Sequence, residues 1–343
     1  MKLLRICAIL LAAAGSIASP PAIAEYLVKE VGSFHVGGRQ AVLSGLLAKE
    51  ISFTAGMPPI KVDPNGEFEV EQIYVQYVKL SQPKAKVPIL LWHGGGLTGV
   101  TWETKPDGKA GWQQFFLAAG YDTYVSDAVE RGRASWARYP EIYKSEPFFR
   151  SKKEAWELFR IGPSYEVGGR REAFEGTQFP TEAFDQFAKQ GVPRWATNDT
   201  ATQAAYDALV QKVCPCIIVV HSQGGNFGFR AALNAPDKIK ALVAIEPSGA
   251  PDPAQVDVSK LKGVPHLIVF GDHLQDSTAW QTFLKAPQRY SAALTSAGVD
   301  ATWLDLPALG IKGNTHMLMM DRNSDEIARL VHESLVRHEL ASN

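Results

Sequence analysis

Ser222 stands at a junction that can make a serine nucleophilic. The apolar residues 216–220 predict a strand buried on both faces, and residues 226–233 predict a helix after it. Gly224 keeps the turn between them free of a side chain, so the hydroxyl would be displayed at the end of the strand. Val220 stands where such turns usually carry a glycine, and a serine before a helix is often only its N-cap. Nucleophilic chemistry therefore depends on partners elsewhere in the chain.

The first partner is a base that takes the serine proton in acyl transfer. His316 lies in a Gly-Asn-Thr-His loop that follows the last predicted strand. Loops at the carboxyl ends of parallel strands meet at one edge of a sheet, which is where the base must be. We predict that His316 is the base, with His273, a few residues past another strand end, as the rival candidate.

The second partner is a carboxylate that orients the base, and two residues are candidates. Asp272 follows one predicted strand, but it lies closer to the strand end than the acid of such enzymes usually does. Glu246 emerges from the neighbouring strand into a proline turn, and its longer side chain could cover the extra distance. We favour Glu246 on these grounds and keep Asp272 as the alternative.

A further buried strand ends in a His-Gly-Gly-Gly sequence that could bind the developing oxyanion. Three successive glycines let the backbone approach a ligand closely and direct N–H groups at it. We predict that the N–H groups of Gly95 and Gln223 form the oxyanion hole, and that Gly94, Gly96 and Leu97 line the substrate site. A glycine turn without a ligand is the alternative, and the dinucleotide-binding pattern G-x-G-x-x-G is absent.

Strands and helices alternate along most of the chain, which predicts an α/β fold with a mostly parallel, doubly wound sheet. Residues 26–80 alternate apolar and polar side chains instead, and predict antiparallel strands at the N-terminus. Residues 135–196 interrupt the alternation and are rich in aromatic side chains. We predict that they form a helical cap insertion over the site, so that 25–134 and 197–343 make up the core.

The first 24 residues have the pattern of a signal peptide. Lys2 and Arg5 precede the apolar residues 6–14, and Ala-Ile-Ala before Glu25 offers a cleavage site. The apolar run is too short to span a bilayer, and no later stretch is suitable. We therefore expect an exported protein, periplasmic or secreted, without a membrane span.

Charge and cysteine content limit the kinds of ligand and macromolecular partner that the chain is expected to bind. The chain has 35 basic and 36 acidic residues without runs of like charge, so neither nucleic acid nor an anionic membrane is an expected partner. No Cys/His spacing fits a metal site, and we expect neither metal nor cofactor. Export would place Cys214 and Cys216 in an oxidising compartment, where a disulfide and two buried thiols are both open alternatives.

Five blocks of sequence carry a resemblance to a known family: residues 101–108, 270–273, 306–310, 313–317 and 320–323. Together they resemble exported bacterial serine esterases of the α/β-hydrolase superfamily that use glutamate as the triad acid. The resemblance implies Ser222 as nucleophile, His316 as base and Glu246 as acid, acting on a small carboxylic ester. It also implies homodimers. Hydrolysis of a lactone, thioester or amide on the same triad, and a non-catalytic binding protein, are the alternatives.

Overall fold

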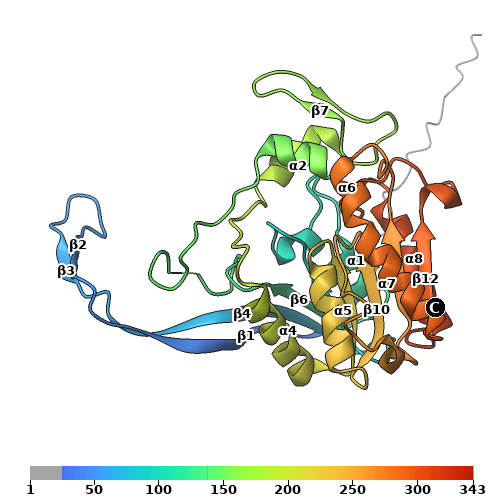
Figure 1. Ribbon diagram of the computed structural model, residues 1–343, viewed down its shortest axis with the longest axis horizontal. Helices are drawn as coiled ribbons and strands as arrows, with labels where there is room; N and C mark the ends of the chain where they lie inside the picture. Colours follow the sequence, from blue (N-terminus) through green and yellow to red (C-terminus); the bar gives the residue numbers. More distant parts are fainter. Residues whose placement is uncertain (1–24, 137, 343) are drawn as a thin grey trace, which may run out of the picture.

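The computed structural model describes residues 25–136 and 138–342, and its centre is an eight-stranded mixed sheet in the order β1-β4-β6-β5-β9-β10-β11-β12 (Figure 1). The last six strands in this order run parallel to one another. They are β6 (Thr123–Asp127), β5 (Ile89–Trp92), β9 (Cys216–His221), β10 (Ile239–Ile245), β11 (His266–Phe270) and β12 (Ala301–Asp305). The predicted α/β fold with a mostly parallel sheet is confirmed.

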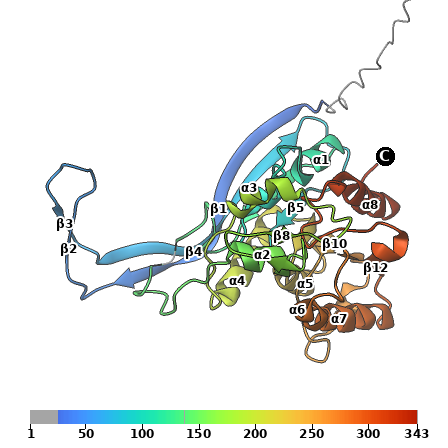
Figure 2. The same cartoon turned by 90° about the horizontal axis from the view of Figure 1, so that it is seen from above.

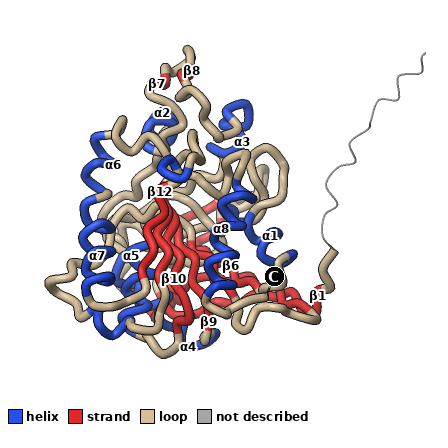
Figure 3. Tube along the Cα trace, turned by 90° about the vertical axis from the view of Figure 1, so that its right-hand side faces the viewer, coloured by secondary structure: helices blue, strands red, loops and turns tan. Residues whose placement is uncertain are grey.

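Helices cover both faces of the sheet, which therefore lies between two apolar cores (Figure 3). One face packs against α4 (Asp199–Val213), α5 (Gly224–Asn234) and α7 (Lys285–Ser296), and the other against α1 (Trp112–Ala118) and α8 (Ser324–Arg337). Side chains of a strand point alternately to its two faces, so Ile218 and Val220 of β9 enter the first core while Ile217 and Val219 enter the second. This double burial explains the uninterrupted apolar run before Ser222.

The predicted N-terminal antiparallel strands form a long hairpin that projects from the body of the protein (Figures 1 and 2). β1 (Val28–Leu43) pairs with β4 (Gly66–Leu80) along its length, and only residues 74–78 of β4 pair with β6. The short strands β2 (Lys49–Ile51) and β3 (Ile60–Val62) lie at the tip, where Leu47, Phe53, Met57 and Ile60 are exposed. The alternating pattern predicted the strands but not that half of the hairpin would leave the core.

The aromatic segment 135–196 lies above the carboxyl end of the sheet (Figures 1 and 3). It contains two short helices, α2 (Lys152–Leu158) and α3 (Phe184–Ala188), and the two-residue strands β7 (Ser164–Tyr165) and β8 (Arg171–Glu172), with irregular chain between them. Five of its buried aromatic residues join the second core together with Leu97; they are Trp156, Phe159, Phe179, Phe184 and Phe187. Tyr143 and Trp195 form a small separate cluster. The segment is thus less helical than expected, and its limits as a cap remain a prediction.

Three further features of the sequence bear on export: the signal peptide, the membrane-span prediction and the two cysteines. The predicted signal peptide, residues 1–24, lies outside the described residues. Within the described part of the chain, no helix combines the length and apolar character required to cross a bilayer. A disulfide joins Cys214, which directly follows α4, to Cys216, the first residue of β9; this is the oxidised one of the two states left open by the sequence.

Candidate active site

Ser222 occupies a strained turn between β9 and α5. Its φ of 54° lies in the left-handed region, which residues with a side chain seldom adopt unless the surroundings enforce it. Its N–H donates to the carbonyl of Ile245, and its own carbonyl accepts from the N–H groups of Gly225 and Ser248. These bonds hold the serine at the end of the sheet, where it is partly exposed between buried neighbours.

Close packing explains why this turn contains small residues, and why position 220 need not be a glycine. A Cβ on Gly224 would lie 2.8 Å from the carbonyl oxygen of His93. A Cβ on Gly228, one turn further along α5, would lie 2.7 Å from Cγ1 of Val220. The room that a glycine in the strand would supply is therefore supplied by Gly228 on the helix, and strand and helix still pack closely.

Glu246 and His316 meet in the protein interior next to this turn. The Nδ1 atom of His316 lies 3.2 Å from Oε2 of Glu246, and both side chains are buried. Glu246 directly follows β10, the strand adjacent to β9, and its φ of 52° turns its side chain out of the strand direction. Two residues that are 70 positions apart in sequence thus form one buried pair.

The two rival candidates are engaged elsewhere. The carboxylate of Asp272 accepts hydrogen bonds from the backbone N–H groups of His273 and Gly313. The His273 ring is bonded to Asp276 and stacks on Phe174, with ring centroids 3.9 Å apart. The structure therefore brings Glu246, rather than Asp272, to His316.

The loop that carries His316 is held by a buried carboxylate, Asp321. Its oxygens accept hydrogen bonds from the Thr315 N–H and hydroxyl at 2.8 Å each, and from the Asn314 amide at 2.9 Å. Burial raises the pKa of Asp321 to about 7, although these hydrogen bonds oppose the shift. Asp321, which follows His316, thus ties its own segment to the two residues that precede His316.

His221 connects this loop to the Ser222 turn. Its Nε2–H donates to the main-chain oxygen of His316 at 2.9 Å, and the two rings lie 4.4 Å apart between centroids. Burial is the main cause that lowers the pKa of His221 well below 6.5, and the neighbouring His316 adds to the shift, so His221 stays neutral. The Ser222 hydroxyl forms no hydrogen bond with a described residue, and such bonds commonly tighten only when substrate is bound.

The surroundings of His316 keep its imidazole neutral. Its ring packs between Trp280 and Phe159, at centroid distances of 4.4 and 5.3 Å. Burial, followed by the positive charges of Arg160 and Arg150, lowers the pKa of His316 well below 6.5. A neutral imidazole can accept a proton, while the adjacent Glu246 favours the imidazolium that forms.

Arg160 belongs to this site, and the sequence did not reveal it. Its Nη2 donates to Oε1 of Glu246 at 2.7 Å, and its Nε donates to the carbonyl of Asp272 at 2.7 Å. The guanidinium also lies over the Trp280 ring, 4.6 Å from its centroid, and is fully buried. The same Glu246 oxygen accepts from the Gly271 N–H at 2.5 Å. No motif marks this arginine, because its partner is 86 residues away.

The glycine loop lies against Ser222 and the start of α5. A Cβ on Gly94 would be 2.8 Å from Cβ of Ser222, and a Cβ on Gly95 would be 3.1 Å from Oε1 of Gln223. Within the described chain, the N–H groups of Gly95 and Gln223 donate to no acceptor. The two predicted donors are therefore adjacent to the serine and free to bind a ligand oxygen.

Gly96 and Leu97 line a small cavity of about 50 Å³ beside this loop. Phe159 and Phe187 give it apolar walls, and Arg150 contributes a charge. Because Phe159 also contacts the His316 ring, this cavity adjoins the candidate catalytic residues.

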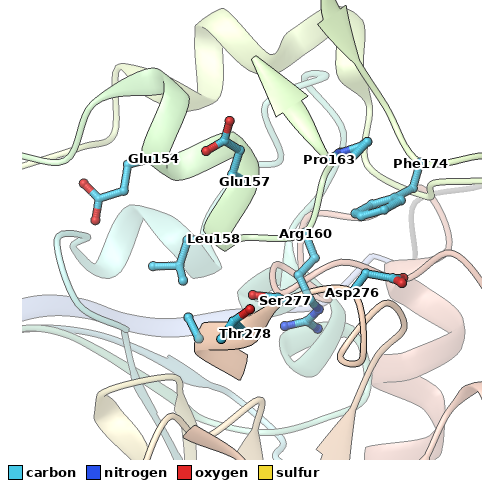
Figure 4. Close-up of a pocket in the computed structure, with 11 residues that line it drawn as sticks. Glu154, Glu157, Leu158, Arg160, Pro163, Phe174, Asp276, Ser277 and Thr278 are labelled. Atoms are coloured by element: carbon cyan, nitrogen blue, oxygen red, sulfur yellow. The ribbon is translucent and has the colours of Figure 1, made fainter. Parts of the chain in front are cut away.

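A larger cleft of about 380 Å³ is lined in part by α2 (Figure 4). Glu154, Glu157 and Asp276 line it, and Arg160 borders it. Its acidic lining, which includes no residue of the glycine loop, makes it a poorer candidate for the ester.

Comparison with known proteins identifies the family. No family model matches the chain. A solved structure of a bacterial esterase is 35% identical to it, has a TM-score of 0.77, and covers 92% of this chain and 97% of that chain. The chain belongs to the esterases of the α/β-hydrolase superfamily. A "Probable secreted lipase phiG" from a fungal species is 28% identical to this esterase. The match covers 78% of this chain and 86% of the fungal protein. The resemblance seen in the sequence is thereby confirmed, and the protein is a serine ester hydrolase.

Proposed function

We propose that this esterase cleaves small carboxylic esters through an acyl-enzyme, with Ser222 as nucleophile, His316 as base and Glu246 as acid. The observation that carries the proposal is the 3.2 Å contact between His316 Nδ1 and Glu246 Oε2, directly beside the strained turn of Ser222. The alternatives Asp272 and His273 have other partners.

Acylation begins when the Ser222 hydroxyl oxygen attacks the ester carbonyl carbon and its proton moves to Nε2 of His316. The carbonyl oxygen becomes an oxyanion, to which the N–H groups of Gly95 and Gln223 donate. Each such donor contributes about 3 kcal/mol to the transition state. His316 then gives the proton to the leaving alkoxide as its bond to the carbonyl carbon breaks, which leaves the acyl group on Ser222.

Deacylation repeats these steps with water as the nucleophile. His316 takes a proton from water, the resulting hydroxide attacks the acyl carbon, and the proton returns to Ser222 as the carboxylic acid leaves. Glu246 accepts a hydrogen bond from the Nδ1–H of His316 throughout and stabilises each imidazolium. Arg160 and the Gly271 N–H orient the other carboxylate oxygen, so Glu246 stays aimed at the ring.

The test compares two matched carboxylate-to-amide variants on 4-nitrophenyl acetate. We expect Glu246→Gln to lower kcat by about 10⁴-fold, because the amide favours the wrong tautomer of His316. Asp272→Asn should change kcat far less, and Ser222→Ala should lose at least as much as Glu246→Gln while circular dichroism remains native. A larger loss in Asp272→Asn would reassign the acid, and turnover by Ser222→Ala would show that another residue is the nucleophile.

The same protein can be offered matched lactone, thioester and amide substrates. A higher kcat/KM on one of these than on the oxoester would replace the ester as the preferred bond. An organophosphonate should add its mass to a peptide containing Ser222, whereas folded protein that stays unlabelled would favour a non-catalytic binding protein.

We also propose export, on the signal-peptide pattern of the sequence and the secreted relative. N-terminal sequencing of the mature protein from the producing cells should begin near Glu25, and an intact Met1 would contradict it. Export to the periplasm or to the medium remains a prediction, and so does the homodimer.

A further inference from the structure

Three arginines lie around the candidate substrate site, and within the described part of the chain only one of them, Arg150, forms an ion pair. Arg131 is 3% exposed and donates only to neutral atoms, at 3.5 Å to the Leu97 carbonyl and 3.4 Å to Oε1 of Gln223. Both acceptors belong to the residues that form the predicted oxyanion hole and pocket. The Nε–H of Arg131 is buried and has no partner among the described residues.

Arg194 lies directly over the glycine loop. Its Nη1 is 2.8 Å from the position that a Cβ on Gly95 would occupy, so only glycine leaves room for it. Its side chain forms no hydrogen bond or ion pair with the part of the chain that the structure describes, and its Nε is buried. The Val192 N–H donates to the Gly96 carbonyl at 3.0 Å, which ties the segment carrying Arg194 to the same loop.

Arg150 lines the small cavity beside the glycine loop, and an antiparallel bridge between Phe148 and Arg194 brings its segment beside Arg194. One of its nitrogens donates to Glu154 at 2.6 Å, but the Glu154 side chain is 38% exposed, and the buried Nε of Arg150 has no partner among the described residues. A partly buried guanidinium thus faces the cavity with hydrogen-bonding capacity to spare.

The excess of positive charge is costly in the absence of a ligand. Burial, followed by repulsion from Arg194, lowers the pKa of Arg131 to about 10, and burial also lowers the pKa of Arg150 and Arg194. Asp199 offsets part of this charge, but it is exposed and accepts from the Gln223 amide. Buried charges are normally paired, so an anion from outside the chain is the missing partner.

We propose that the ester substrate carries a free carboxylate, which Arg194 and Arg150 bind beside the oxyanion hole. The proposal rests on the proposed function, because it assigns the substrate class at the same site. A guanidinium binds a carboxylate through two parallel hydrogen bonds, and these are strong where water is excluded. Because Arg194 touches Gly95, the carboxylate must be only a few bonds from the scissile carbonyl, as in a half-ester of a short dicarboxylic acid.

The experiment compares esters that differ only in this charge. The first pair is the 4-nitrophenyl half-ester of succinic acid and its methyl-capped diester, with the carboxylate on the acyl side. The second pair is the acetate of 4-hydroxybenzoic acid and the acetate of its methyl ester, with the carboxylate on the alcohol side. We expect kcat/KM of the wild-type esterase to be at least about 10-fold higher for the anionic member of one pair, corresponding to one charge-assisted contact, and that pair identifies the side.

Arginine variants test which residues produce the preference. Arg194→Gln and Arg150→Gln should each lower kcat/KM about 10-fold to 100-fold more for the preferred anionic ester than for its neutral partner, mainly through KM. Arg170→Gln removes the same charge at an exposed position of the insertion and should leave the preference unchanged. Arg194→Lys keeps the charge and should retain part of the preference for the anionic ester. Melting curves show whether each variant is folded.

The outcomes separate this proposal from the one on which it rests. Equal losses on anionic and neutral esters in Arg194→Gln would make Arg194 a donor to the oxyanion and overturn the carboxylate site. The absence of any wild-type preference, with neutral esters still cleaved, would do the same and leave the esterase function intact. Failure to cleave any of the four esters would refute the proposed function itself.

Discussion

The contact between Arg160 and Glu246 allows a quantitative prediction, because both side chains are fully buried. Arg160→Met removes a hydrogen bond of 2.7 Å to Glu246 and one of 2.7 Å to the Asp272 carbonyl. Glu246 would keep only the Gly271 N–H and His316 as partners. Removing one member of a buried ion pair leaves the other charge uncompensated, so we expect a loss of about 3–5 kcal/mol in the free energy of unfolding.

Arg39→Met is the matched control, since the same residue change breaks a pair on the exposed hairpin. Arg39 donates to Glu71 at 2.8 and 2.9 Å, but its side chain is 50% exposed. Solvent screening limits such a pair to about 0.2–1 kcal/mol. Urea unfolding followed by tryptophan fluorescence measures both variants under the same conditions.

Kinetics provide the second readout, one that a merely structural residue would not affect. Without Arg160, Glu246 is no longer aimed at His316, and a displacement of about 1 Å in a catalytic group costs about 10²-fold in rate. We expect kcat on 4-nitrophenyl acetate to fall by about that factor while KM changes little. Arg160→Lys retains the charge, and its kcat should lie between those of the wild type and Arg160→Met. A stability loss as small as that of Arg39→Met, or a native kcat in folded Arg160→Met, would refute the positioning role.

Two further predictions follow from the same region. Burial and the charges of Arg160 and Arg150 lower the pKa of His316 well below 6.5, and only the neutral ring accepts the serine proton. We therefore expect kcat/KM on a neutral ester to stay constant as the pH is lowered to 6.5. A fall in kcat/KM that begins at or above pH 6.5 would contradict this reasoning. Gly228→Ala should cost about 1–3 kcal/mol in urea unfolding by pressing on Val220, and less in a Val220→Ala background; additive costs would show that the two positions do not touch.

Regular elements were predictable because their signals are local. The strand predicted at 216–220 is β9 (Cys216–His221), and the helix predicted at 226–233 is α5 (Gly224–Asn234), because apolar runs and helical periodicity depend on neighbouring residues. The N-terminal hairpin shows the limit of such signals. Its alternation of apolar and polar side chains is the same in the half that packs on β6 and in the half that projects from the body.

The acid of the site shows a different limit. From the residues alone, Glu246 and Asp272 were both open, because each follows a strand at the same edge of the sheet. The decision depends on which side chain reaches His316 and which is held by neighbouring backbone N–H groups. Those contacts involve atoms from separate loops and have no counterpart in local sequence.

The sequence by itself determined the α/β fold, the strand–serine–helix turn and the order of Ser222, Glu246 and His316, because strand burial, helix periodicity and turn chemistry act over a few neighbouring residues. Only the tertiary structure decided that Arg160 compensates Glu246, that Gly228 makes room for Val220, and that Arg131, Arg150 and Arg194 remain without full compensation around the glycine loop. Charge compensation in a low-dielectric interior depends on distances between groups that are far apart along the chain, and packing alone sets those distances.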